Sequence, residues 1–270
     1  MLTRTINRKL SGMGKKFVLS LGSGGLRGYV HLGVYKALHE NNIKIDAIYG
    51  CSVGALIGAF ISEGWEPDKL VELALKLSAF DLVDLTFPNN GYILGKKLNS
   101  YIQTHIKAKN LEDLPIPLTI VATKTHSGEA EYFQQGPAAD CIQASSSIPN
   151  VFRPVTIFGI EYLDGDLCSP VPIRKAREDN GKKAVILAVN VIPQAPLADR
   201  SSKKWADLIS RTIYRQTLVA NEKPFADFYL NPTLGYGVKF NKKDSIQRIE
   251  IGYQQTKAII PQLQQILGVD

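Results

Sequence analysis

Two strand–turn–helix units in direct succession constrain the fold of this chain more than any other feature of its sequence. Residues 16–22 (KFVLSLG) form a short apolar run that ends in glycines, and residues 26–39 then place Val30, Val34 and Leu38 at helical spacing. The pattern repeats with an apolar run at 45–51 and small apolar residues at 53–63. Such repetition is typical of βαβ units, so we predict an α/β fold with a mainly parallel central sheet.

The rest of the chain extends this pattern. The run at 184–192 is almost entirely Val, Ile, Leu and Ala, which predicts a strand in the middle of the sheet. Residues 117–123 and 131–133 flank turn residues and are predicted to form a hairpin. Helices are expected over 67–79, 98–106, 138–147, 201–222 and 245–267. We expect the apolar side of the fourth, from Trp205 to Leu218, to pack in the core. Pro261 is expected to interrupt the fifth, either as a kink or as a restart of the helix.

Composition excludes several classes of protein. Of the 270 residues, 44% are hydrophobic and 21% are charged, as in a soluble globular domain. The longest apolar runs, at 53–61 and 184–192, are too short to cross a bilayer, and the basic N-terminus lacks the apolar segment of a signal peptide. Three cysteines without a CxxC pattern indicate neither a disulfide framework nor a zinc site. We therefore expect a reducing, cytoplasmic location.

The net charge of +7 favours acidic partners. Nucleic acid and anionic lipid head groups both meet this condition, and charge alone does not choose between them. The basic leader at 1–15 is either a solvated tail or a means of bringing the protein to anionic membranes.

A serine stands at the junction of the second strand–helix unit. In residues 50–54 (GCSVG), Gly50 and Gly54 flank Ser52 in the pattern G-x-S-x-G. In a nucleophile elbow the serine occupies a strained turn between a strand and a helix, and small neighbours leave room for it. The alternative is a serine that only caps the helix. The placement between a predicted strand and a predicted helix favours the nucleophile.

The base that would activate this serine is not an obvious histidine. In α/β-hydrolases an acid and then a histidine follow the serine, whereas here every histidine precedes Asp164: His31, His39, His105 and His126. A triad would need Asp81 or Asp84 to pair with His105 or His126, and no local pattern marks such a pair. Asp164 follows a short apolar run and precedes Gly165, so its carboxylate is a candidate base. The alternative is a hairpin turn with solvated acids.

A glycine-rich turn leads into the first helix. The backbone N–H groups of Gly24 and Gly25 are candidates to bind either a phosphate or the oxyanion of a tetrahedral intermediate. The dinucleotide pattern G-x-G-x-x-G fails in register, and the Gly-Lys-Ser/Thr of a P-loop is absent. The oxyanion hole fits better.

Taken together and in this order, three motifs resemble the patatin-like phospholipases: the glycine-rich turn with Arg27 and Gly28, the GCSVG elbow, and Asp164-Gly165. The resemblance covers about residues 16–192, including ASSSIPNVFRPV at 144–155. It implies a three-layer α/β/α fold and a Ser–Asp dyad without histidine. It also implies that Ser52 is the nucleophile, Asp164 the general base, and the Gly24 and Gly25 amides the oxyanion hole, with a structural role for Arg27.

Two residues depart from the family's motifs. Ser23 stands where the family has the first glycine of its glycine-rich turn, and Asp166 stands where Gly or Ala usually follows Asp-Gly. We expect Ser23 to leave the two amide donors in place. A second carboxylate beside Asp164 is expected to raise the pKa of Asp164 or to change its access to solvent.

The resemblance implies a serine acyl hydrolase that cleaves fatty-acyl esters of phospholipids or related lipids without a metal or other cofactor. The alternatives are a small-molecule esterase or thioesterase with the same dyad, and a non-catalytic module that binds phosphate or lipid. We divide the chain into the leader at 1–15, a catalytic domain at 16–200 and a helical C-terminal part at 201–270 packed on the same domain. Nucleic acid is not expected as a partner, and the oligomeric state is left open.

Overall fold

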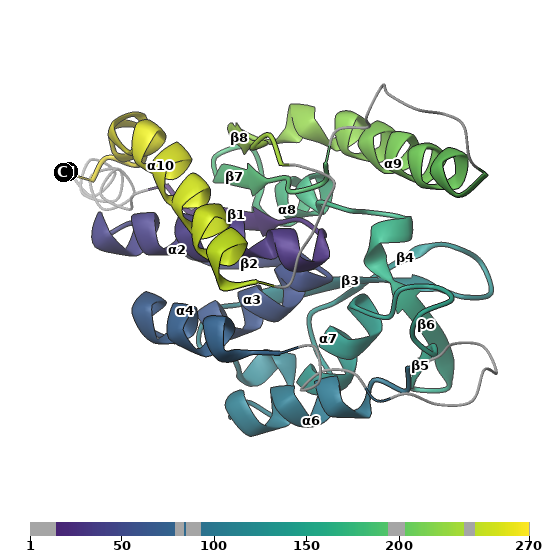
Figure 1. The fold of residues 1–270 in the computed structure, drawn as a ribbon. Helices are drawn as coiled ribbons and strands as arrows, with labels where there is room; N and C mark the ends of the chain where they lie inside the picture. The colour runs from purple at the N-terminus through teal and green to yellow at the C-terminus, as the bar shows by residue number, and fades with distance from the viewer. Residues whose placement is uncertain (1–14, 79–83, 85–92, 194–202, 235–240, 270) are drawn as a thin grey trace, which may run out of the picture.

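An eight-stranded sheet crosses the middle of the molecule (Figure 1). The computed structural model describes residues 15–78, 84, 93–193, 203–234 and 241–269. The strands are β1 (Phe17–Leu21), β2 (Ala47–Cys51), β3 (Leu118–Lys124), β4 (Ala130–Phe133), β5 (Val155–Ile157), β6 (Ile160–Asp164), β7 (Val185–Val189) and β8 (Phe228–Leu230). Their order is β5-β6-β3-β2-β1-β7-β8, with β4 also paired to β3.

Five neighbouring strands are parallel, namely β3, β2, β1, β7 and β8. The pairs of β3 with β4, β3 with β6 and β5 with β6 are antiparallel. This confirms the prediction of a mainly parallel sheet. The run at 184–192 contains β7, which lies beside β1 near the centre as expected. The predicted hairpin is the pair β3 and β4.

Helices cover both faces of the sheet. They are α2 (Tyr29–Glu40), α3 (Val53–Ser62), α4 (Pro67–Lys76), α6 (Lys96–His105), α7 (Ala138–Ser145), α8 (Ile173–Asn180), α9 (Lys203–Glu222) and α10 (Lys242–Leu267). Short 3-10 turns lie at η1 (Gly25–Gly28), η2 (Leu111–Asp113), η3 (Gly165–Leu167) and η4 (Lys223–Phe225). Among the helices of the described residues, none has the length and apolar character needed to span a membrane.

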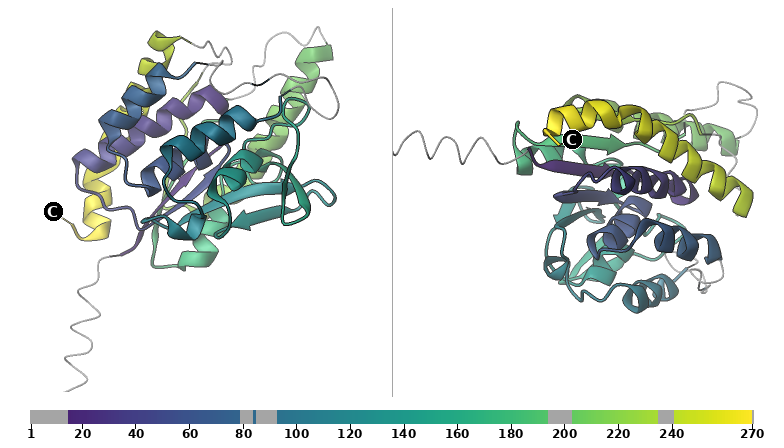
Figure 2. Two further views of the ribbon diagram at one scale, coloured as in Figure 1. Left: turned by 90° about the horizontal axis from the view of Figure 1, so that it is seen from below. Right: turned by 90° about the vertical axis from the view of Figure 1, so that its left-hand side faces the viewer.

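The alternation of side chains along β1 shows the three layers. Phe17, Leu19 and Leu21 belong to the larger core cluster, together with buried residues of α2, α3, α6, α7 and α10. Val18 points to the other face, where it joins a smaller cluster with residues of α8 and α9. Because both faces are covered, the central strands are apolar throughout rather than alternating. The expected α/β/α arrangement is confirmed (Figure 2).

The C-terminal helix α10 packs along α2 (Figure 2). Two glycines let the backbones of these helices approach each other closely. A Cβ atom added to Gly33 of α2 would lie 1.8 Å from the carbonyl oxygen of Ile249, and one added to Gly252 of α10 would lie 2.1 Å from that of Val30. Both obstacles are backbone atoms, which cannot turn aside. These two glycines therefore join the C-terminal part to the first strand–helix unit.

The structure differs from two expectations about the C-terminal helices. α10 begins at Lys242, and it continues through Pro261 without interruption. The missing N–H of a proline removes one helical hydrogen bond, whereas Ile260 and Leu263 beside it are buried and hold the helix against the core.

The apolar side of α9 is also only partly in the core. Ile213 is 54% exposed, and Thr212 and Val219 are buried in its place. The side chains of residues 203–209, including Trp205, lie outside the described residues.

The contact between α2 and α10 predicts a large effect of one methyl group. Gly252→Ala should lower the free energy of unfolding by at least about 2 kcal/mol, because the backbones must separate to admit the new Cβ atom. Alanine is otherwise the better helix former, so propensity alone predicts the opposite sign. Chemical denaturation measures the change. Lys257→Ala, at an exposed position of the same helix, is the control. A Gly252→Ala protein as stable as the control would contradict this packing.

Candidate active site

Ser52 occupies a strained turn between β2 and α3. Its backbone has φ 54° and ψ −121°, a region that residues with a Cβ atom rarely adopt. The strand ends at Cys51, and the Ser52 carbonyl already accepts helical hydrogen bonds from the N–H groups of Ala55 and Leu56. This is the geometry of a nucleophile elbow, in which the turn presents the serine side chain at the end of the strand.

The glycines on either side of Ser52 are required by close backbone contacts. A Cβ atom on Gly54 would lie 2.1 Å from the carbonyl oxygen of Leu21, and one on Gly50 would lie 2.6 Å from Cα of Ala55. The elbow therefore packs directly against the end of β1. This is the role that the G-x-S-x-G pattern predicts for its two glycines.

The pairing of β3 explains how Asp164 reaches Ser52. β3 pairs with β2 as far as Val121, which is opposite Cys51, and with β6 from Ala122, which is opposite Asp164. β4 pairs with residues 120–123 of β3 and so occupies its other edge. β2 and β6 therefore lie on the same edge, one beyond the other and running in opposite directions. Their C-terminal ends meet, so that β2 ends next to Ser52 and β6 ends at Asp164.

The two side chains are in direct contact. Ser52 Oγ donates a hydrogen bond of 2.9 Å to Asp164 Oδ2. Both residues are buried, with 7% of Ser52 and 2% of Asp164 exposed. The other carboxylate oxygen, Oδ1, accepts a 2.9 Å hydrogen bond from the backbone N–H of Asp166. The carboxylate is therefore held at both oxygens.

Burial raises the pKa of the Asp164 carboxyl to about 7. The main cause is loss of hydration of the charged form, and the negative charge of Asp166 adds to it. The hydrogen bonds from the Asp166 N–H and from Ser52, and the charge of Arg215, act in the opposite direction. The pKa of Asp164 thus lies in the range where a general base works best at neutral pH. The charge of Asp166 raises the pKa of Asp164, which is the direction expected from the sequence.

The glycine-rich loop runs from the end of β1 into η1. It is attached to the sheet at two points, since the N–H of Gly22 donates to the Val189 carbonyl at 3.0 Å and that of Ser23 to the Pro170 carbonyl at 2.8 Å. Gly25 has a positive φ of 55°. Within the described part of the chain, the N–H groups of Gly24 and Gly25 have no hydrogen-bond acceptor. They are thus available to an oxygen atom of a ligand.

The remaining motif glycines, Gly28 and Gly165, allow these loops to pack closely. Arg27 and Gly28 belong to η1, and a Cβ atom on Gly28 would lie 2.4 Å from a methyl group of Val53, the first residue of α3. The glycine-rich turn thus packs against the elbow. A Cβ atom on Gly165 would lie 2.3 Å from the carbonyl oxygen of Val121. Gly165 therefore lets η3 turn closely over β3.

Sequence reasoning missed three positioning residues. The N–H of Ser52 donates to Ser145 Oγ at 2.9 Å, and the N–H of Asp164 donates to the Ser147 carbonyl at 2.9 Å. Both serines come from the ASSSIP segment at the end of α7, so this segment holds both Ser52 and Asp164 in place. His31 of α2 is fully buried and donates from Nε2 to the Gly22 carbonyl at 2.8 Å. Three adjacent serines before a proline were the signal for the first two.

Within the described residues, the structure contains no histidine-based alternative to the Ser52–Asp164 pair. Burial lowers the pKa of His31 to about 4, which keeps it neutral, and its hydrogen bond goes to the glycine-rich loop. His105 Nδ1 bonds to the Tyr101 carbonyl, and Asp84 accepts the backbone N–H groups of Gly95 and Lys96. Asp81 lies outside the described residues. Among the described residues, no histidine contacts Ser52 or Asp164.

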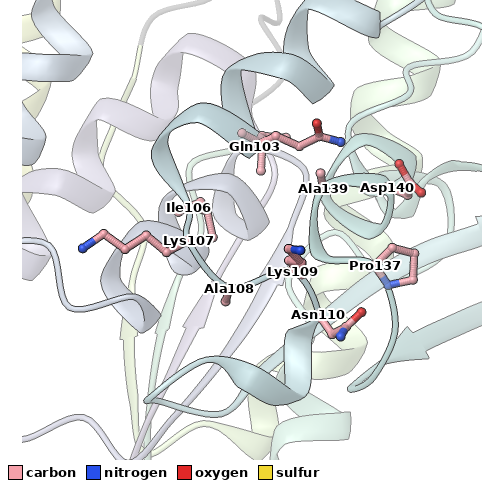
Figure 3. A pocket seen from close by; sticks show the side chains of 10 residues that line it. Gln103, Ile106, Lys107, Ala108, Lys109, Asn110, Pro137, Ala139 and Asp140 are labelled. Carbon is pink, nitrogen blue, oxygen red and sulfur yellow. The ribbon is translucent and has the colours of Figure 1, made fainter.

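A cavity of about 510 Å³ lies elsewhere, between the end of α6 and the start of α7 (Figure 3). It is lined by polar groups such as Gln103, Lys107 and Asp140 together with apolar ones such as Ile106. Neither Ser52 nor Asp164 lines it. The contact between Ser52 and Asp164 therefore lies outside this cavity.

Comparison with solved structures supports the fold. VipD from Legionella pneumophila matches with a TM-score of 0.61 and 15% identity, over 93% of this chain and 67% of that one. A chain of the complex of SpcU with ExoU from Pseudomonas aeruginosa matches with a TM-score of 0.52 and 12% identity, over 94% of this chain and 53% of that one. At such identities the likeness is one of fold alone.

Comparison of sequences identifies the family. An uncharacterized NTE family protein of Mycobacterium tuberculosis is 31% identical over 201 residues, which are 73% of this chain and 56% of that protein. Lysophospholipase NTE1 of Cryptococcus neoformans is 31% identical over 214 residues, which are 76% of this chain and 13% of that protein. The chain thus spans little more than half of the first relative and a small part of the second. The family model for patatin-like phospholipase matches residues 19–177. The chain therefore belongs to the patatin-like phospholipase family.

Proposed function

We propose that this protein is a serine acyl hydrolase that cleaves fatty-acyl esters of phospholipids or lysophospholipids with Ser52 and Asp164. The observation that carries the proposal is the buried 2.9 Å hydrogen bond between Ser52 Oγ and the Asp164 carboxylate. The strained backbone of Ser52 and the raised pKa of Asp164 support it. The family and the relative named as a lysophospholipase support a lipid as the substrate.

The first half of the reaction forms an acyl-enzyme. Ser52 Oγ attacks the ester carbonyl carbon while its proton passes to Asp164, and the carbonyl oxygen becomes an oxyanion. The N–H groups of Gly24 and Gly25 stabilise this oxyanion, which in comparable sites contributes about 10²–10³ in kcat per donor. The intermediate then expels the alcohol, which takes the proton from Asp164.

The second half releases the fatty acid. Asp164, again ionised, accepts a proton from water as the water oxygen attacks the acyl carbon. The second oxyanion collapses, the bond to Ser52 Oγ breaks, and the serine takes the proton back from Asp164. All four proton transfers use one carboxyl group, and none needs a histidine.

Two alternatives keep part of this site. A small-molecule esterase or thioesterase would use the same dyad, and it would prefer soluble substrates over lipids. A non-catalytic phosphate- or lipid-binding module would need neither a strained serine nor a buried carboxylate.

Contact of the basic leader with anionic membranes also remains a prediction, because residues 1–14 lie outside the described residues. Co-sedimentation with anionic vesicles, with and without the leader, tests it.

Activity of dyad variants tests the proposal. Ser52→Ala should lower hydrolysis of both lysophosphatidylcholine and a soluble p-nitrophenyl ester by at least about 10³-fold, and Asp164→Asn should lower it by about 10²–10⁴-fold. Ser127→Ala, an exposed serine in the β3–β4 turn, is the control. Activity on the soluble ester alone would favour the small-molecule esterase. Unchanged activity in Ser52→Ala would refute the nucleophile.

The pH dependence should report the base. Because burial raises the pKa of Asp164 to about 7, kcat/KM should rise with pH and level off above an apparent pKa near 7. His39, His105 and His126 touch neither dyad residue, so the change of each to Gln should leave this profile in place. A histidine change that abolishes turnover in a folded protein would show that the dyad is incomplete.

The same pKa predicts a pH-dependent stability. The folded state keeps on Asp164 a proton that the unfolded chain, with a pKa of 3.8, has already lost, so stability falls as pH rises from about 4 to about 7. Asp164→Asn has no such charge. Its free energy of unfolding should exceed that of wild type by about 1–4 kcal/mol at pH 8, and much less at pH 4.5. Denaturation at the two pH values measures this, and a pH-independent difference would count against a buried, ionisable Asp164.

A further inference from the structure

The two residues that depart from the family's motifs lie against each other. Ser23 Oγ of the glycine-rich loop donates a hydrogen bond to Asp166 Oδ1. Both contact a third residue, Arg215 of α9, whose Nε forms a 2.7 Å ion pair with the Asp166 carboxylate. Arg215 Nη2 also donates to Ser23 Oγ at 3.2 Å. Ser23 and Asp166 are therefore parts of one network, centred on a residue of the C-terminal helix.

This network touches both halves of the proposed catalytic site. Ser23 directly precedes Gly24, one of the two proposed oxyanion donors. The backbone N–H of Asp166 donates to Asp164 Oδ1, so the position of Asp166 also determines where the dyad carboxylate lies. We propose that Arg215 is a positioning residue for the hydrolysis reaction: it joins the glycine-rich loop to the Asp164 loop and balances the Asp166 charge beside the base. This inference rests on the proposed function.

The balance of charge is needed because Asp166 stands close to a buried carboxylate. The ionisable groups that act on Asp164 are Asp166, which raises its pKa, and Arg215, which lowers it. The thiols of Cys51 and Cys168 also face these groups, and burial raises the pKa of each, which keeps them neutral. Within the described residues, Arg215 is the cation that pairs with Asp166.

The rest of α9 is attached independently of this pair. Gln216 Nε2 donates to the Ile192 carbonyl at 3.2 Å, and Tyr214 Oη donates to the Leu167 carbonyl at 3.3 Å. At the end of the helix, Glu222 accepts the Ser169 hydroxyl at 2.9 Å and the Ile173 N–H at 2.7 Å. These contacts should keep α9 in place when Arg215 is changed, so a variant reports on the site rather than on loss of the helix.

Binding of a lipid phosphate by Arg215 is a less suitable role. Its side chain is only 23% exposed, and its Nε is already engaged by the Asp166 carboxylate. A phosphate group would have to displace that carboxylate, leaving it unpaired beside Asp164.

The pH profile of kcat/KM on a soluble ester separates a charge-balancing role from a merely structural one. Arg215→Gln should move the acidic limb to higher pH by about half a unit to one unit, because the Asp166 charge is no longer balanced. Asp166→Asn should move it to lower pH, because its side chain loses the charge while its backbone N–H remains. Arg215→Lys should keep the limb near that of wild type, because the positive charge is retained. Arg211→Gln, which removes the same charge one turn earlier on α9, should leave the limb in place.

The outcomes are distinct. Opposite shifts in Arg215→Gln and Asp166→Asn support the inference, and an unmoved limb in a folded Arg215→Gln protein overturns it. If that variant does not fold, Arg215→Gln is made in the Asp166→Asn background, where no carboxylate is left unpaired. The acidic limb of this double variant should then lie at higher pH than that of Asp166→Asn alone. Acidic limbs at the same pH would overturn the inference. Failure of the proposed function looks different, because wild type would then hydrolyse no more ester than Ser52→Ala.

Discussion

The active site depends on the way two strands share one edge of β3. β2 pairs with the first half of that edge and β6 with the second half, in opposite directions, so that the ends of the two strands meet. One strand continues into the elbow with Ser52, and the other ends at Asp164. Residues 112 positions apart in sequence are thereby placed at hydrogen-bond distance by backbone pairing. The side chains need only adopt their rotamers.

This arrangement has an electrostatic cost that the surrounding residues limit. A carboxylate that is 2% exposed loses most of its hydration, which raises its pKa. The Ser52 hydroxyl and the Asp166 N–H each donate to one of its oxygens, and Arg215 offsets the charge of Asp166. In the proposed mechanism, Asp164 is thereby a base strong enough to accept a proton from serine, yet partly ionised near neutral pH. Local strain and burial of this kind are common where function takes precedence over stability.

The parts of this site that sequence can predict are those made of neighbouring residues. The apolar runs before Gly22 and Ser52, the glycines of the elbow and the order of the three motifs led to the sheet, to Ser52 and to Asp164. The contact between Ser52 and Asp164 could not be predicted from the sequence, because no sequence pattern indicates that β6 pairs with β3. Ile160 and Glu161 are exposed, so β6 looks like a strand of an ordinary surface hairpin.

Contacts between segments that lie far apart in the sequence could not be predicted either. Ser145 and Ser147 lie in a segment that the family resemblance already marked. Its three adjacent serines were a signal, but nothing in the sequence relates them to both Ser52 and Asp164. Arg215 lies on a helix whose pattern favoured core packing, and nothing near it in the sequence relates it to Asp166. The effect of Pro261 was overestimated for the same reason, since the tertiary contacts of α10 outweigh one lost hydrogen bond.

Covalent labelling with a fluorophosphonate, followed by mass spectrometry of the digested protein, tests the Ser52–Asp164 account most directly. The reagent mimics the tetrahedral intermediate and requires an activated serine held next to a base. The account predicts one adduct per chain, located on Ser52, formed much more slowly in Asp164→Asn and not at all in Ser52→Ala. An adduct on another serine, or equal labelling of wild type and Asp164→Asn, would contradict it.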